Sequence, residues 1–141
     1  MIPVFDGHND LLLRLLLDPG RREEIFLTGE GKGHLDLPRM QAAGFAGGFF
    51  AVYIPSPHDD DDGLDYMAMM EVPPYTLPLP DLIGFDAAIG PATQAVAHLH
   101  WMERASGGAL KIVRGAGDLD ACIADGTIAA ILHMEGAEAI D

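Results

Sequence analysis

Phe5-Asp6-Gly7-His8-Asn9-Asp10 is the stretch around which we expect the chain to be organised, because it ends a short apolar run with a histidine and a carboxylate two residues apart. Residues 2–5 are predicted to enter as a β-strand. Side chains alternate between the two faces of a strand, so His8 and Asp10 are sent to the same face. Imidazole nitrogens and carboxylate oxygens both bind divalent metal ions. The stretch therefore predicts half of a metal site at the end of the first strand.

A second carboxylate follows the last apolar run of the chain. Glu135 comes directly after residues 128–134, which have the composition of a buried strand. If this strand and the first strand end on the same side of a sheet, Glu135 reaches the point where His8 and Asp10 converge. These three residues are our candidate metal ligands.

The segments between these two strands alternate between helix and strand patterns. Helices are predicted over residues 11–17, 36–44, 86–105 and 118–125, and strands over residues 47–54, 111–113 and 128–135. Charged and glycine-rich residues over 21–33 are typical of a mobile surface loop, and residues 55–80 indicate a long loop with one helical turn. A continuous apolar strand such as residues 47–54 is typical of a parallel sheet. The alternation therefore predicts the α/β class.

Composition narrows the classes of function. The chain has 141 residues, 49% of them hydrophobic, which is enough apolar material for one domain core. Its formal net charge of -14 disfavours nucleic acid and anionic membrane surfaces as partners and leaves a small molecule or a protein. No signal peptide is recognisable, and residues 11–17 are far short of the roughly 20 that a membrane span needs. With Cys122 as the single cysteine, no intramolecular disulfide can form, so we expect a cytoplasmic protein.

Several motifs resemble, in their order along the chain, the membrane dipeptidase (renal dipeptidase) family. They are DGHNDL at residues 6–11, HLDLPRM at 34–40, GFAGGFFAVY at 44–53, HMEG at 133–136 and ID at 140–141. The resemblance spans nearly the whole chain. It implies a (β/α)8-barrel hydrolase with two zinc ions that cleaves dipeptides through a metal-bound hydroxide. It also makes His8 and Asp10 ligands of one zinc, and Glu135 the catalytic carboxylate that bridges both.

The bridging role has a chemical reason. A two-metal amide hydrolase needs a ligand that binds both ions about 3.5–4 Å apart, so that a water held between them is activated. A carboxylate can bridge two ions, whereas an imidazole cannot. The pair of ions therefore depends on Glu135.

The resemblance covers only the first part of the family's barrel. The other zinc ligands of the family, two histidines and a late aspartate, lie further along than residue 141, and a barrel of this type takes about 250 residues. We therefore expect residues 1–141 to be a single partial domain, the amino-terminal segment of a dipeptidase barrel with about three βα units. Open barrel edges would leave Phe49 or Val52 in contact with water and favour a homo-oligomer. The isolated chain would have little or no peptidase activity.

Other polar residues have ordinary structural explanations. His34 and Asp36 repeat the His-x-Asp spacing, but they follow a glycine-rich loop and Asp36 suits the N-cap of the next helix. His133 lies two residues before Glu135 and shares its face, where we expect it to fill the barrel interior or support the site. Residues 58–62, a histidine and four aspartates, indicate a solvated acidic loop. We expect His98 and His100 on the surface, and Cys122 is no candidate nucleophile.

The leading hypothesis is a zinc-dependent dipeptidase that acts on a dipeptide substrate. Two alternatives stay open. The chain is either a non-catalytic truncated fragment or assembly part, or it belongs to another binuclear metal hydrolase that acts on cyclic amides or esters.

Overall fold

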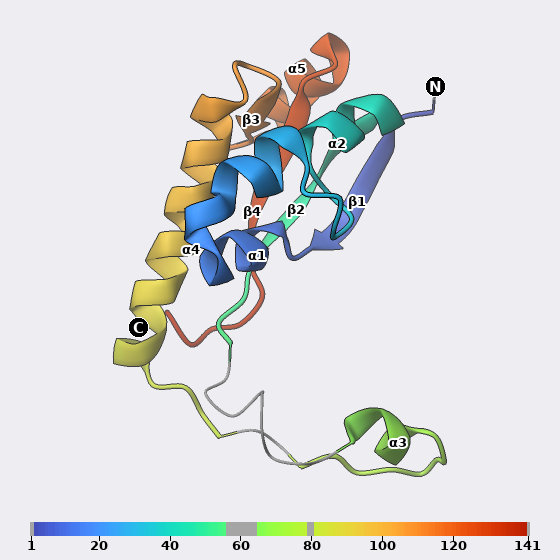
Figure 1. The fold of residues 1–141 in the computed structure, drawn as a ribbon, viewed down its shortest axis with the longest axis vertical. Coiled ribbons are helices and arrows are strands. Elements are labelled where there is room, and N and C mark those ends of the chain that lie inside the picture. Colours follow the sequence, from blue (N-terminus) through green and yellow to red (C-terminus); the bar gives the residue numbers. More distant parts are fainter. Residues whose placement is uncertain (1, 56–64, 79–80, 141) are drawn as a thin grey trace.

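The computed structural model describes residues 2–55, 65–78 and 81–140. Its strands are β1 (Val4–Asn9), β2 (Phe45–Val52), β3 (Leu110–Ile112) and β4 (Ile128–Met134). Its helices are α1 (Leu11–Leu17), α2 (Leu37–Ala43), α3 (Tyr66–Met70), α4 (Phe85–Ala105) and α5 (Ala116–Asp125), with a short 3₁₀-helical turn η1 (Pro19–Arg21) and a short π-helical turn η2 (Glu24–Thr28) between α1 and α2. The strands form one parallel sheet in the order β1-β2-β4-β3 (Figure 1). The predicted α/β class with a parallel sheet is confirmed.

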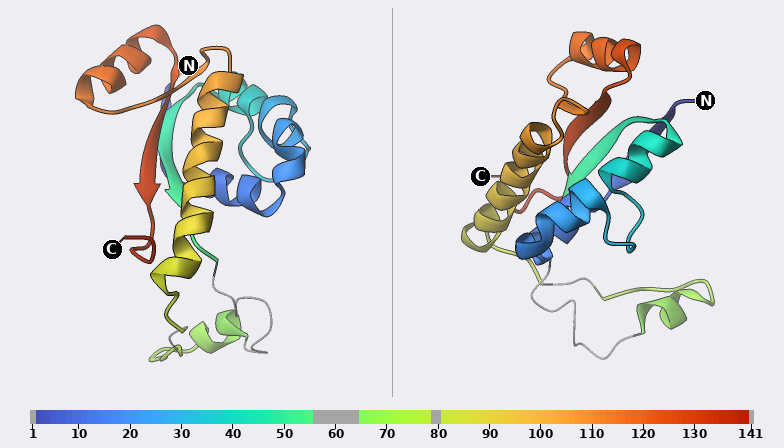
Figure 2. Two further views of the ribbon diagram at one scale, coloured as in Figure 1. Left: turned by 90° about the vertical axis from the view of Figure 1, so that its left-hand side faces the viewer. Right: turned by 45° about the horizontal axis from the view of Figure 1, so that its top comes forward.

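Helices α1, α2 and α4 cover one face of the sheet (Figure 2). Alternation along β2 sends Phe50 and Val52 into the core between the sheet and these helices, and Val52 is only 1% exposed. The expectation that Val52 meets water is therefore wrong. Phe49 points to the opposite face, where it is half-buried and packs edge-on against Phe5 with 6.2 Å between ring centroids. The open face of a partial barrel thus carries Phe49 but not Val52.

Strand β1 is longer than the predicted residues 2–5. Its backbone pairs with β2 as far as Asn9, which lies opposite Phe50. Helix α1 follows at once, with Asp10 at its N-cap position. The Asp10 side chain makes no capping hydrogen bond, so its carboxylate stays available at the end of the strand. The predicted strand directly followed by a helix is confirmed.

The segment expected to be a mobile loop, residues 21–33, is partly helical. Turn η2 buries Ile25 and Phe26 in the core, and Phe26 packs edge-on against Trp101 of α4 at 5.9 Å. Arg22 lies over the same Trp101 ring, 4.8 Å from its centroid. The loop prediction was wrong for residues 21–28, because burial of these two apolar side chains outweighs the charged character of their neighbours, whereas residues 29–33 form no helix or strand.

The predicted ends of α2 are confirmed. Asp36 accepts a hydrogen bond from the backbone N–H of Arg39 at 2.8 Å, and Gly44 adopts the left-handed conformation that ends the helix, with φ of 69°. The helical turn predicted within residues 55–80 is α3. No helix in the described part of the chain is both long and apolar enough to span a membrane.

The described sheet has two open edges, whereas the strands of a closed barrel have none. On one side β1 is the outermost strand, and on the other the short β3 pairs only with the first residues of β4, from Ile128 to Ala130. The predicted short strand over residues 111–113 therefore exists and extends the sheet beyond β4. The later residues of β4 keep an edge that β3 does not reach.

Candidate metal centre

The three candidate ligands meet at the carboxyl ends of two strands. His8 is the second-to-last residue of β1, Asp10 comes just after that strand, and Glu135 follows the end of β4. Strand β2 lies between them, and the backbone N–H of Glu135 donates to the carbonyl of Val52 at 3.2 Å. This bond ties the end of β4 to the end of β2. The site therefore lies where parallel α/β enzymes carry their chemistry.

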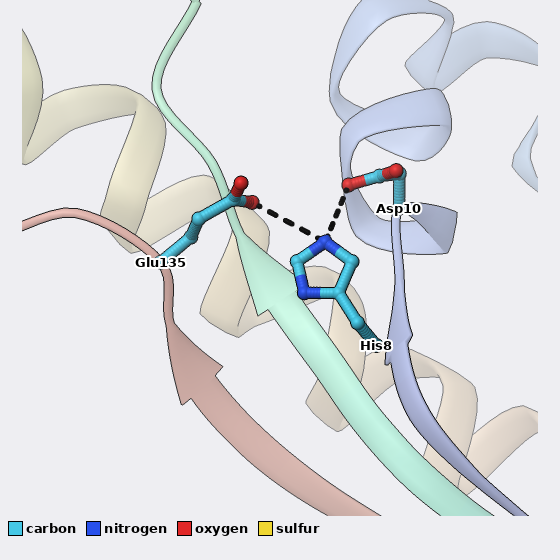
Figure 3. A group of neighbouring side chains, drawn as sticks. All are labelled: His8, Asp10 and Glu135. Atoms are coloured by element: carbon cyan, nitrogen blue, oxygen red, sulfur yellow. Dashed lines mark ion pairs between the residues drawn. The ribbon is translucent and has the colours of Figure 1, made fainter.

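Both carboxylates face the same nitrogen of His8. Nε2 of His8 is 3.4 Å from Oδ1 of Asp10 and 3.5 Å from Oε2 of Glu135 (Figure 3). One donor atom from each residue lies within 4.8 Å of the other two. The side chains of His8, Asp10 and Glu135 are 42%, 56% and 37% exposed, so an ion can reach them from solvent.

These separations suit one small divalent ion. Bonds of 2.0–2.2 Å from zinc to nitrogen and oxygen place two ligand atoms about 3.4 Å apart in a tetrahedral site. The two measured separations of 3.4 Å and 3.5 Å match that edge length. Two carboxylates around one imidazole also concentrate negative charge, which a cation relieves. The donor set therefore fits a divalent metal ion.

His133 lies beside His8 without joining the candidate ligand group found among the described residues. Its ring lies edge-on to that of His8, with centroids 5.7 Å apart and an interplanar angle of 82°. Phe49 packs against the same ring at 6.0 Å. His133 therefore stands on the open face of the sheet and fills space beside His8, as its position two residues before Glu135 predicted.

His34 and Asp36, which repeat the His-x-Asp spacing, have different surroundings in the structure. Asp36 is buried and caps α2, while His34 lines a cavity of about 680 Å³ that also borders His8 and Asp10. Neither residue belongs to the metal-binding group. The acidic run at residues 58–62 lies outside the described residues.

His98 and His100 of α4 were both predicted to lie on the surface, and the structure confirms this for only one of them. His98 is only 9% exposed, so its expected surface position is wrong, whereas the side chain of His100 is exposed. His98 falls on the row of α4 that also buries Leu99 and Met102. Burial lowers the pKa of His98, and the nearby Arg22 lowers it further.

Cys122 is a buried free thiol on α5. Burial is the largest cause of its raised pKa, so the thiolate form is disfavoured. This agrees with the prediction that Cys122 is no nucleophile.

Sequence reasoning assigned no role to Asp6 or Asn9, two residues of the first motif whose side chains are joined. Nδ2 of Asn9 donates to Oδ2 of Asp6 at 3.0 Å, and His8 lies between the two residues in the chain. Asn9 is a buried polar residue, 9% exposed. The signal that could have found them is the clustering of aspartate and asparagine at a strand end, where these side chains close local turns.

A parallel α/β sheet with side chains that could ligate a metal at the carboxyl ends of its strands is typical of a class, the metal-dependent hydrolases built on (β/α) barrels. The chain belongs to the membrane dipeptidase family, peptidase family M19, whose model matches residues 1–141. The resemblance seen in the motifs is thereby confirmed. The homologues of this family are metallopeptidases.

Solved structures of this family superpose closely on the chain. A metallo peptidase from Rhodobacter sphaeroides, liganded with a phosphinate mimic of the dipeptide L-Ala-D-Ala, is 56% identical with a TM-score of 0.88. The comparison covers 99% of this chain and 39% of that one. The structure of dipeptidase AC, also a metallo peptidase of family M19, is 55% identical with a TM-score of 0.87, over 99% of this chain and 38% of that one.

A further relative is also matched over about two fifths of its length. A protein of Acinetobacter calcoaceticus, described as an uncharacterized protein in the PQQ-III 3' region, is 35% identical over 149 residues, which are 99% of this chain and 42% of the relative. The chain thus spans about two fifths of the length of the relatives it matches, and its fold corresponds to the amino-terminal part of the family's barrel.

Proposed function

We propose that residues 1–141 form the amino-terminal, metal-binding segment of a zinc-dependent dipeptidase. The observation that carries the proposal is the convergence of Asp10 and Glu135 on Nε2 of His8 at separations that suit one zinc ion. Imidazole and carboxylate are donors that zinc accepts readily, whereas calcium and magnesium favour all-oxygen sites. Membership of family M19 supports the peptidase class.

Each ligand has a distinct task in this proposal. His8, Asp10 and Glu135 would hold one ion, and Oε2 is the oxygen of Glu135 that faces His8. A divalent ion at this position would supply Lewis-acid chemistry, which acidifies water and polarises the scissile carbonyl. The family resemblance makes Glu135 the catalytic carboxylate shared by two ions, so its loss would remove both metal positions.

The substrate is proposed to be a dipeptide. The support is the Rhodobacter sphaeroides relative, which is liganded with a phosphinate mimic of L-Ala-D-Ala. The two-metal hydrolysis implied by the family resemblance needs a second metal position, and the described residues offer one group of three candidate ligands. We therefore propose little or no peptidase activity for residues 1–141 on their own. Cyclic amides and esters, tested beside dipeptides, distinguish a dipeptidase from another binuclear hydrolase.

The first experiment measures metal content. The wild-type protein is compared with His8→Ala and Glu135→Gln by zinc analysis after dialysis against a limiting zinc concentration. His100→Ala is the matched control, because His100 is exposed on α4 and belongs to no ligand group among the described residues. We expect bound zinc in wild type and the control, and its loss in both ligand variants. Equal zinc content in all four proteins would refute the assignment.

The second experiment measures hydrolysis. This chain replaces the matching segment of the Rhodobacter sphaeroides relative, to which it is 56% identical. We expect the chimaera to hydrolyse L-Ala-D-Ala and to lose activity on His8→Ala. A folded, zinc-loaded chimaera that cleaves esters or cyclic amides but no dipeptide would contradict the proposed substrate.

A second proposal concerns assembly. Strand β1 is an unpaired edge in the described sheet, and its apolar residues Val4 and Phe5 are 52% and 40% exposed. Exposed strand edges pair with other chains. We propose that residues 1–141 self-associate as a homo-oligomer through this edge. Size-exclusion chromatography with light scattering is the test, and a monomer at all protein concentrations would count against it.

A further inference from the structure

Asn9 lies between the candidate ligands His8 and Asp10 in the chain, and its side chain makes three hydrogen bonds. Its Nδ2 donates to Oδ2 of Asp6 at 3.0 Å and to the carbonyl of Phe49 at 3.1 Å. Its Oδ1 accepts from the backbone N–H of Leu11 at 3.4 Å. The side chain therefore joins the end of β1, the middle of β2 and the start of α1.

Asp6 accepts hydrogen bonds from two residues that follow it in the same motif, His8 and Asn9. Its Oδ1 accepts from the backbone N–H of His8 at 3.3 Å, while its Oδ2 accepts from Asn9. One carboxylate thus holds both the backbone of a metal ligand and the side chain of the next residue. We call Asp6 and Asn9, with these bonds, the Asp6–Asn9 clamp.

The clamp spans an irregularity in the pairing of β1 with β2. Asp6 lies opposite Gly48 and Asn9 opposite Phe50, so β1 has one more residue than β2 over this interval. An extra residue of this kind is a β-bulge, which re-aims the side chains that follow it.

The bulge decides which way His8 points. Strict alternation from Phe5 would place His8 on the opposite face from Phe5, under the helices. In the structure the Phe5 ring packs on Phe49, Phe49 packs on His133, and His133 packs on His8, so all four rings share the open face. Asp6 and Asn9 share the other face. The open-face position of His8 therefore depends on the bulge that the clamp spans.

We propose that the Asp6–Asn9 clamp is a positioning device for the metal centre. It holds the bulge that turns His8 to the open face, and it fixes the start of α1 so that Asp10 follows within reach of the same ion. Neither residue contacts the ion in this scheme, which rests on the proposed function because the ion is the group being positioned. Substituting a residue that hydrogen-bonds to a metal ligand and orients it typically weakens metal affinity about 10–100-fold.

The test removes the hydrogen-bond donor and then restores it. Asn9→Asp keeps the shape of the side chain but turns an oxygen towards Oδ2 of Asp6 and the carbonyl of Phe49. Asn9→Ala removes the side chain without adding charge. The exchange variant Asp6→Asn/Asn9→Asp keeps the wild-type charge and restores a donor–acceptor pair between the two positions.

The readout is Co²⁺ titration, followed by visible absorption, together with the melting temperature of the metal-free protein. Asp36→Ala is the matched control, because Asp36 is a buried carboxylate that caps α2 and does not belong to the candidate metal group. We expect Asn9→Asp and Asn9→Ala to weaken Co²⁺ binding about 10–100-fold, and the exchange variant to recover part of that loss. Asp36→Ala should lower the melting temperature while leaving Co²⁺ affinity unchanged.

Three outcomes separate the possibilities. Equal Co²⁺ binding by wild type and His8→Ala overturns the metal centre itself. His8-dependent binding that Asn9→Asp and Asn9→Ala leave unchanged overturns the clamp alone. An equal loss of affinity in Asp36→Ala shows that general destabilisation explains the effect, which also overturns the clamp. Should Asn9→Asp fail to fold, Asp6→Ala, at a half-buried position, makes the same comparison.

Discussion

Replacing Phe26 with alanine tests the part of the fold that most contradicts its local sequence. Phe26 is fully buried, with 0% of its surface exposed, and its ring meets Trp101 edge-on at 5.9 Å. Removing a buried phenylalanine costs about 3–5 kcal/mol through lost burial and the cavity that remains. The lost aromatic pair accounts for about 0.5–1.5 kcal/mol in similar cases. We expect Phe26→Ala to lower the free energy of unfolding by about 4 kcal/mol.

The assay is urea unfolding followed by circular dichroism, with Phe85→Ala as the control because Phe85 is 40% exposed at the start of α4. The control should change the unfolding free energy by less than about 1 kcal/mol, as surface substitutions usually do. Phe26 packs in the core against Trp101 and is not one of the candidate metal ligands, so the Co²⁺ affinity of the folded variant should match wild type. A loss below about 1 kcal/mol for Phe26→Ala would mean that residues 21–33 form the mobile loop their composition indicates.

Three further predictions follow from single contacts. Zinc at about 100 times its dissociation constant should raise the unfolding free energy by about 2.7 kcal/mol in wild type and leave His8→Ala unchanged, as measured by urea titration with and without zinc. Because the pKa of His98 is lowered in the folded state, the unfolded chain binds a proton more readily, so stability should fall as the pH drops below about 6.5. His98→Gln should reduce this loss of stability at low pH. The same pH dependence of the unfolding free energy in wild type and His98→Gln would contradict the role of His98. The side chain of Glu30 is 8% exposed and paired with Arg14 and Arg21, so Arg14→Ala should lower the unfolding free energy by about 3 kcal/mol, since a buried carboxylate loses a partner. A change in the unfolding free energy within about 0.5 kcal/mol, measured by urea unfolding, would show that Arg21 alone is enough to stabilise the Glu30 carboxylate.

Local chemistry made several elements predictable. Asp36 and Gly44 mark the ends of α2 through a capping bond and a left-handed glycine, and both effects act within a few residues of the chain. The apolar run that becomes β4 and the strand directly followed by α1 are likewise visible in composition alone. These elements could be read because their causes lie in neighbouring residues.

Burial by distant partners made other elements unpredictable. Turn η2 forms because Ile25 and Phe26 find the core, and His98 is buried because α4 turns that row of side chains towards the helices and sheet. Neither fact follows from the residues on either side. The partners that decide them, such as Trp101 for Phe26, are far away in the sequence.

The sequence by itself identified the candidate metal ligands of this protein: a histidine and two carboxylates, His8, Asp10 and Glu135, placed after apolar runs in the order typical of a dipeptidase family. Only the tertiary structure decided that they meet. The bulge between Asp6 and Asn9 sets the face of His8, and the strand order β1-β2-β4 sets Glu135 beside it. The physical reason is that strand pairing joins residues remote in the chain, whereas sequence patterns report only the periodicity of near neighbours.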